Sequence, residues 1–124
     1  MRSNKAMTTS EVAARFHELS QQEKWFEIQD ELFADDVRSI EPSTAKGLAN
    51  AIGKAAVRQK GEALVSQVEA VHKASTTAPV VAGTHFAVGR ELDMTVRGMG
   101  RTQMNEVMLY EVKAGKIVSE QFFY

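Results

Sequence analysis

A glutamate set among methionines is the residue of this sequence best placed to transfer a proton. Glu106 lies two positions from Met104 and two from Met108, so the three side chains share one face of an extended strand. A carboxylate in apolar surroundings loses hydration, and this loss raises its pKa towards the range in which a general acid or base works. We therefore predict Glu106 as the catalytic residue. A structural role, in a buried ion pair with Arg90, is an equally weighted alternative.

Other side chains on the same predicted face could hold a substrate. We predict that Arg90 and Tyr110 hold or polarise a substrate oxygen and that Gln121 orients the ligand. Trp25 and Met108 are predicted to line the binding site, and core packing is the alternative role for each.

Two further acids stay open as alternatives. Asp93 is predicted to point away from the face of Glu106, but a one-residue slip in strand pairing would exchange the two faces and bring Asp93 into the pocket. Glu41 falls in a short predicted strand whose orientation the sequence does not determine.

The residue types and spacings do not suggest a metal or nucleotide site. His17, His72 and His85 form no HxH or HxxxH pair, and the chain has no cysteine to form a disulfide or ligate a metal. Gly98 and Gly100 lie in a predicted hairpin that no helix follows, so they do not form a phosphate-binding loop. We predict that the protein uses no metal and no cofactor.

Length and composition indicate a single folded domain. The chain has 124 residues, of which 44% are hydrophobic and 25% charged, and its net charge is -1. The lack of a basic excess argues against nucleic-acid binding. No apolar run approaches the roughly 18 residues that would suggest a membrane span, and the N-terminal stretch lacks the apolar segment of a secretory signal. We predict a cytoplasmic protein with no membrane partner.

The pattern of apolar residues predicts an α+β domain over residues 9–124, preceded by a flexible tail at residues 1–8. The predicted helices are Thr8–Leu19, which begins with a capping box, Trp25–Phe33 and Lys54–His72. The predicted strands are Val37–Glu41, Thr84–Val96, Arg101–Lys113 and Lys116–Tyr124. The N-terminal helices are expected to pack on the antiparallel strands that follow them.

The two predicted hairpins allow a register to be proposed. A loop centred on Met99 pairs Met94 with Met104 and places Arg90 diagonally from Glu106. A two-residue turn at Ala114-Gly115 pairs Tyr110 with Ser119. The face that carries Arg90, Glu106 and Gln121 is then covered by the helices. The opposite face is too apolar for open water on a small monomer, which predicts a homodimer through the outer sheet face. It carries Val107, Leu109, Val118, Phe122 and Tyr124 among Asp93, Asn105 and Glu120.

At the level of whole motifs, the chain resembles a known family. The motifs are Trp25-Phe26, Leu32-Phe33-Ala34-Asp35-Asp36-Val37 and the stretch Tyr110 to Tyr124 with Gly115-Lys116-Ile117-Val118 at its turn. They resemble those of the nuclear-transport-factor-2-like superfamily and, within it, the SnoaL-like domains named after a polyketide cyclase. Ala114 stands where aspartate is common in that turn. The resemblance implies a cystatin-like cone, in which a strongly curved sheet wraps an internal pocket, and it also implies dimers through the outer sheet face.

The resemblance leaves the reaction open, because the superfamily hosts many chemistries. It includes isomerases, dehydratases, epoxide hydrolases and cyclases, and Glu106 cannot be matched to a family acid position by position. The first hypothesis is a cofactor-independent acid–base enzyme that acts on a small hydrophobic molecule. The alternatives are a non-catalytic protein that binds or senses such a molecule, and a dimerisation module with a filled core and no cavity.

Overall fold

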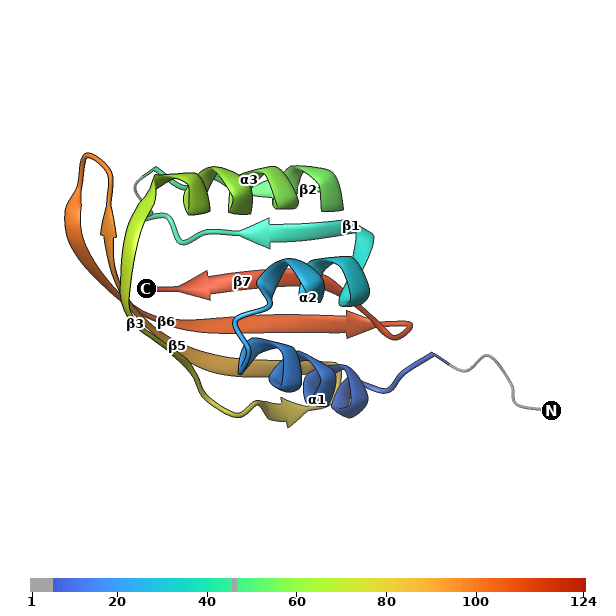
Figure 1. Cartoon of the computed structure of the whole chain (residues 1–124). Coiled ribbons are helices and arrows are strands. Elements are labelled where there is room, and N and C mark those ends of the chain that lie inside the picture. The colour runs from blue at the N-terminus through green and yellow to red at the C-terminus, as the bar shows by residue number, and fades with distance from the viewer. Residues whose placement is uncertain (1–5, 46) are drawn as a thin grey trace.

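Three helices cover one face of the sheet (Figure 1). The computed structural model describes residues 6–45 and 47–124. The helices are α1 (Thr9–Ser20), α2 (Trp25–Leu32) and α3 (Lys54–Gln67). The predicted capping box begins α1: the Thr8 hydroxyl accepts from the Glu11 N–H at 3.1 Å, and a Glu11 carboxylate oxygen accepts from the Thr8 N–H at 2.8 Å. No helix in the described part of the chain is long and apolar enough to cross a membrane.

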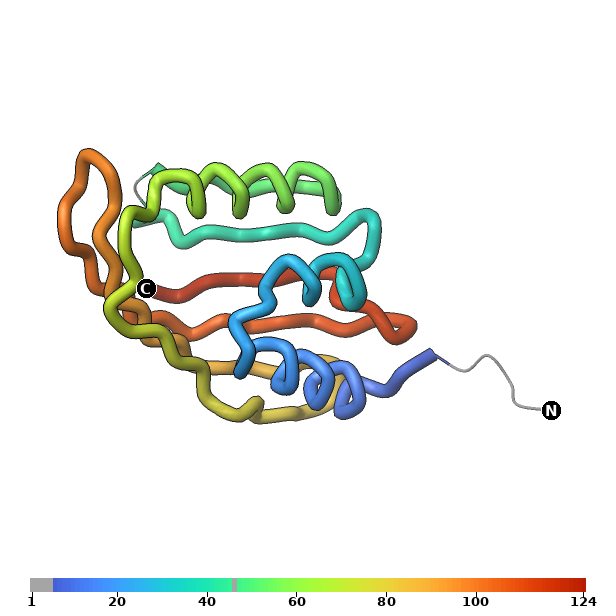
Figure 2. The backbone as a smooth tube through the Cα atoms, viewed as in Figure 1, coloured from blue at the N-terminus to red at the C-terminus, as the bar shows by residue number. Residues whose placement is uncertain are grey.

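The sheet has seven strands and is mixed. The strands are β1 (Phe33–Ile40), β2 (Ala51–Ile52), β3 (Val68–Thr76), β4 (Val80–Ala82), β5 (His85–Val96), β6 (Gly100–Lys113) and β7 (Lys116–Phe123). Their order is β2-β1-β7-β6-β5-β3, and β4 pairs with β5. The predicted α+β fold with helices on an antiparallel sheet is confirmed, and one strand pair of the mostly antiparallel sheet, β1 and β7, runs parallel. Figure 2 shows the β5–β6 hairpin curving upward until it stands beside the C-terminal end of α3.

The third helix is shorter than predicted. It ends at Gln67, and residues 68–76 form β3, which pairs with β5 along the edge of the sheet. Val68 and Val71 fit a helical stripe, but Val71 pairs with Met94 and Ala74 with Leu92. The long edge of β5 provides the backbone partners that turn this segment into a strand. The short strands β2 and β4 were also not predicted. Residues 1–5 of the predicted tail lie outside the described residues.

The two hairpins depart from the predicted register in different ways. In β5–β6, Arg90 pairs directly with Glu106 and Val88 with Met108, a shift of two residues that keeps every side chain on its predicted face. In β6–β7, Val112 pairs with Ile117, but Glu111 pairs with Ser119. Val118 is therefore an extra residue, a β-bulge, and the odd shift exchanges the two faces of β7 beyond it.

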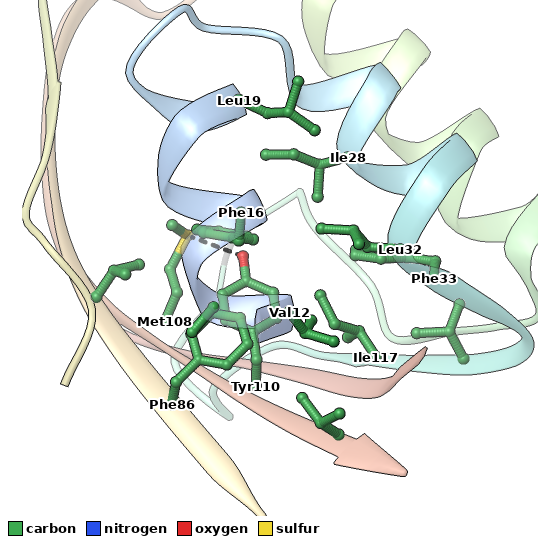
Figure 3. Packing of buried hydrophobic residues seen from close by; sticks show 14 of the residues in the cluster. Val12, Phe16, Leu19, Ile28, Leu32, Phe33, Phe86, Met108, Tyr110 and Ile117 are labelled. Atoms are coloured by element: carbon green, nitrogen blue, oxygen red, sulfur yellow. Dashed lines mark hydrogen bonds between the residues drawn. The ribbon is translucent and has the colours of Figure 1, made fainter. Parts of the chain in front are cut away.

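The hydrophobic core fills the end of the molecule near the β6–β7 turn. Phe16 of α1 packs against Phe86 and Tyr110, with ring centroids 5.2 and 4.7 Å apart, and Phe86 stacks on Tyr110 at 5.0 Å. Figure 3 shows Ile28 and Leu32 of α2 completing this cluster. The core leaves the other half of the concave face free for a cavity.

Candidate functional site

A cavity of about 500 Å³ lies between the helices and the curved sheet, next to the core. Its wall is mostly apolar and includes Trp25 and Phe26 of α2, Leu64 of α3, and Met104 and Met108 of β6. The charged groups in the wall are five glutamates, one lysine and one arginine. A mostly apolar cavity with a few polar groups is typical of a site for a small molecule. It also contradicts the hypothesis of a module with a filled core.

Glu106 lines this cavity, as predicted from its alternation with Met104 and Met108. Among the described residues, none forms a hydrogen bond or an ion pair with its carboxyl group. Burial raises the pKa of Glu106 to about 7, and the charges of Glu41 and Glu120 add to the rise, while Arg90 lowers it in part. The group can therefore either take up or release a proton near neutral pH.

Arg90 also lines the cavity, but it does not form the predicted ion pair with Glu106. Its guanidinium donates to both carboxylate oxygens of Glu23, at 3.0 and 3.3 Å, and to the Thr76 hydroxyl at 3.0 Å. It also lies over the Trp25 ring, 4.5 Å from the ring centroid. The alternative prediction, a buried ion pair between Glu106 and Arg90, is thus wrong, although the two residues are cross-strand neighbours.

Tyr110 and Met108 sit where the cavity meets the core. The Tyr110 hydroxyl donates to the Met108 sulfur at 3.6 Å (Figure 3). Burial, followed by the charges of Glu120 and Glu106, raises the pKa of Tyr110 well above its ordinary value. Tyr110 is therefore a neutral phenol that packs in the core and borders the cavity, and both residues line the site as predicted.

A second polar cluster lies at the α3 side of the cavity. The Lys60 ammonium donates to the Ser39 hydroxyl at 2.7 Å, to a Glu41 carboxylate oxygen at 2.7 Å and to the Ala49 carbonyl at 3.1 Å. The other Glu41 oxygen accepts from the Tyr124 hydroxyl at 2.8 Å. Each ammonium proton of Lys60 and each oxygen of Glu41 thus has a partner. Lys60 lies three residues after Val57 on the inner stripe of α3, a spacing that would have identified it from the sequence.

Glu120 is the acid that the predicted register misplaced. The bulge at Val118 turns it inward, where it pairs across strands with Tyr110 and Ser39 and lines the cavity. Burial raises its pKa to about 7, against the opposing effects of a hydrogen bond with Ser39 and the charge of Lys60. It is a second group that holds a proton near neutral pH.

Three predictions made from the register need correction. Gln121 pairs with Leu109 and does not line the cavity, while Phe122 and Tyr124, predicted on the outer face, do line it. The same odd shift explains all three errors. Asp93 faces away from the cavity as the favoured interpretation held, and both of its oxygens accept from Arg101 at 2.8 and 2.9 Å.

The described residues include no group of three or more histidine, aspartate or glutamate side chains that could hold a metal ion. The polar side chains of the cavity wall carry carboxyl, ammonium, guanidinium and phenol hydroxyl groups, together with the Gln29 amide and the Trp25 indole N–H. What these groups can do chemically is accept, donate and hold protons.

The curved sheet, covering helices and lined cavity define a protein of the NTF2-like, or cystatin-like, fold. The chain belongs to the SnoaL-like domain family, whose pattern it matches over residues 7–124. It is 39% identical to a protein of Mesorhizobium loti that is provisionally named both a SnoaL-like polyketide cyclase and a carbohydrate phosphatase. The match covers 95% of this chain and 100% of that one, with a TM-score of 0.88.

More distant structures show the same fold. An NTF2-like protein of Burkholderia thailandensis is 18% identical, with a TM-score of 0.77 over 94% of this chain and 90% of that one. A protein of Catenulispora acidiphila with a ketosteroid isomerase-like fold, solved in complex with trimethylamine, is 19% identical. Its TM-score is 0.64, over 78% of this chain and 72% of that one. No curated protein matches the sequence significantly.

Proposed function

We propose that this protein is a cofactor-independent enzyme that transfers protons on a small hydrophobic molecule, with Glu106 as the acid–base group. The observation that carries the proposal is a carboxyl group with no hydrogen bond from the described residues, in a mostly apolar cavity of about 500 Å³. Its pKa of about 7 allows both protonation states at neutral pH. A general base of this kind contributes about 100- to 10,000-fold to a rate.

The reaction class that fits best is proton abstraction next to a carbonyl, as in an isomerase or a cyclase. Ionised Glu106 takes a proton from the carbon, and the electron pair of the broken C–H bond forms the C=C bond of an enolate. Returning the proton at another carbon gives an isomer. Alternatively, the enolate carbon attacks a second carbonyl of the same molecule and closes a ring; the C=O π electrons move to that oxygen, and the resulting alkoxide takes the proton back from Glu106. Of the two provisional names of the Mesorhizobium loti protein, the name polyketide cyclase agrees with the second route.

Arg90 and Glu120 can supply hydrogen-bond donors for the enolate oxygen. The Arg90 Nε–H donates no hydrogen bond to the described residues, so this donor is available to a ligand. The protonated form of Glu120 is a second donor on the cavity wall. Hydrogen-bond donors aimed at a developing oxyanion stabilise the transition state more than the ground state.

The charges of the cavity favour a neutral substrate. Lys60 is paired with Glu41 and Arg90 with Glu23, so an anionic ligand would find each of these cations already compensated. It would also meet the unpaired Glu106. Trp25, the methionines and the other apolar wall residues then select for hydrophobic, flat or ring-containing molecules.

Exchange of carbon-bound protons tests the proposal without knowledge of the natural substrate. The probe is 2-tetralone, a fused bicyclic ketone, whose α-deuteration in D₂O is followed by NMR. We expect the wild type to accelerate exchange, with a rate that rises with pH and levels off above about pH 7 as Glu106 ionises. Glu106→Gln should lose at least about 100-fold of this acceleration, while Glu62→Gln, an exposed carboxylate on α3, should keep it.

The binding alternative gives a different result in the same experiment. A protein that only binds or senses the ketone would be stabilised thermally by it, and Glu106→Gln would keep that stabilisation. Exchange that is absent in the wild type, or unchanged in Glu106→Gln, would contradict an acid–base role for Glu106.

We also propose a homodimer through the outer sheet face. Val107 and Phe123 form a cross-strand pair on this face and are 48% and 47% exposed. Exposed apolar pairs on an otherwise regular sheet are typical of a contact with another protein surface. The cytoplasmic location stays a prediction.

A further inference from the structure

Arg90 and Glu106 are direct cross-strand partners of opposite charge, yet they do not form an ion pair. Side chains at such positions have Cβ atoms about 5 Å apart, and opposite charges there attract each other. Burial of the Glu106 carboxyl group strengthens this attraction, because less water screens it. Some other contact must therefore hold the Arg90 guanidinium away from the Glu106 carboxylate.

Glu23 makes that contact from the turn between α1 and α2. Its two carboxylate oxygens accept from both terminal nitrogens of Arg90, and one of them also accepts from the Trp25 indole N–H at 3.0 Å. Trp25 in turn stacks on the guanidinium of Arg90. The hydroxyl of Thr76, on β3, accepts a hydrogen bond from the same guanidinium. Arg90 is thus bound on three sides by groups other than Glu106.

The backbone conformation of Glu23 supports a defined role for its contacts with Arg90 and Trp25. Its φ of +56° lies in the left-handed region, which a glutamate seldom adopts. A residue kept in such a conformation needs compensating contacts. The bidentate contact with Arg90 and the hydrogen bond from Trp25 provide them, and together they lower the pKa of Glu23 although its partial burial opposes ionisation.

We propose that Glu23 is a positioning residue, which withholds Arg90 from Glu106 and so keeps the base unpaired and able to accept a proton. The proposal rests on the proposed role of Glu106 in catalysis. Glu23 itself acts through Arg90, and no contact of Glu23 with a substrate is required.

The other charged and titratable groups around Glu106 have contacts and charge states that do not depend on Glu23. Glu41 at the end of β1 and Glu120 on β7 raise the pKa of Glu106, and Lys60 on α3 is engaged by Ser39, Glu41 and Ala49. Tyr110 and Tyr124 stay neutral at physiological pH because burial raises the pKa of both. A change at Glu23 therefore reaches Glu106 chiefly through Arg90.

The test is a titration of the Glu106 side chain by carboxyl ¹³C NMR, with no ligand present. Glu106→Gln identifies the resonance by its loss. In Glu23→Gln, Arg90 loses one half of its bidentate partner and turns to Glu106, so the Glu106 pKa should fall by about 1 to 3 pH units. Glu27→Gln, which removes another carboxylate of the cavity wall without touching Arg90, should leave the Glu106 pKa within about half a pH unit of the wild type.

A double variant shows whether the effect runs through Arg90. In Arg90→Gln the Glu106 pKa should rise, and adding Glu23→Gln to it should cause no further change. The proposal is overturned if Glu23→Gln alone behaves like Glu27→Gln, or if the fall persists when Arg90 is absent. Urea unfolding of each variant verifies that the titrations report folded protein. Because no turnover is measured, these results are separate from those of the ketone exchange experiment.

Discussion

At the scale of residues, three of the five glutamates in the cavity wall have neighbours that give them different states. Glu41 has both oxygens occupied by Lys60 and Tyr124. Glu120 is only 7% exposed and lies beside Ser39. Glu106 faces the cavity without a hydrogen-bond donor among the described residues. A carboxylate whose oxygens are both occupied is a poor acceptor for a substrate proton, which excludes Glu41 and supports the proposal that Glu106 transfers the proton.

The burial of Glu120 has a consequence for stability. Its pKa in the folded chain is about 7, against 4.5 ordinarily, so the folded state keeps a proton that the unfolded state releases between these pH values. The free energy of unfolding must then fall as pH rises from about 4.5 to about 7 and stay level above. Each unit by which the folded and unfolded pKa values of Glu120 differ corresponds to about 1.4 kcal/mol. Between about pH 4.5 and about pH 7, Glu120→Gln should therefore lose roughly 2 to 3 kcal/mol less of its free energy of unfolding than the wild type does.

Urea unfolding at about pH 5 and about pH 8.5 measures this difference. The wild type should lose more stability between the two pH values than Glu120→Gln does. Glu62→Gln, which removes an exposed carboxylate of α3, serves as the control and should follow the wild type. An equal loss in Glu120→Gln and the wild type would show that Glu120 ionises freely in the folded protein.

At the scale of elements, the β6–β7 turn contains a residue that is poorly suited to its backbone. Ala114 has φ +51° and Gly115 has φ +76°, the two positive values of a type I′ turn. Asparagine adopts this conformation more readily than alanine does. We expect Ala114→Asn to raise the free energy of unfolding by roughly 1 kcal/mol, measured by the urea midpoint at constant m-value. Ala114→Val should lower it, and a gain in both variants would contradict the explanation.

The sequence predicted the elements that have strong local signals. The Thr8 and Glu11 capping box set the start of α1, and Ala114-Gly115 set the position of the last hairpin. The inward direction of Glu106 also followed, because the error in the β5–β6 register was an even number of residues. Alternation between apolar and polar residues is clear in β5, and the hairpin pairing carries the same faces over to β6.

The last strand shows why the rest could not be predicted. Ile117 and Val118 are both apolar, and Phe122, Phe123 and Tyr124 are consecutive aromatic residues, so either phase of alternation looks acceptable. A bulge at Val118 leaves no mark in such a pattern. Glu120, which was predicted to face outward, therefore lines the cavity, and Gln121, which was predicted to face inward, does not. Likewise, the helical spacing of Val68 and Val71 could not reveal that the free edge of β5 would recruit this segment as β3.

At the scale of the whole molecule, the packed core and the cavity occupy different ends of the same concave face. Phe16, Phe86 and Tyr110 fill the end near the β6–β7 turn, while α3 and the curved ends of β5 and β6 enclose the cavity. The side chains around the cavity make fewer apolar contacts than a filled core would, and the packed end supplies the stability that these contacts do not. Substitutions in the cavity wall can therefore alter function while the core keeps the domain folded.

The outer sheet face gives the prediction that concerns the molecule as a whole. A dimer through this face would bury Val107 and Phe123, and a charge at either position would be placed in the apolar contact without a partner. Val107→Glu should therefore convert the dimer to a monomer, observed by sedimentation velocity as a halved mass. Met99→Glu is the matched control, because Met99 is 67% exposed but lies in the β5–β6 loop, away from the sheet face. A wild type that sediments as a monomer, or a Val107→Glu variant that remains dimeric, would mean that the apolar outer face serves another purpose.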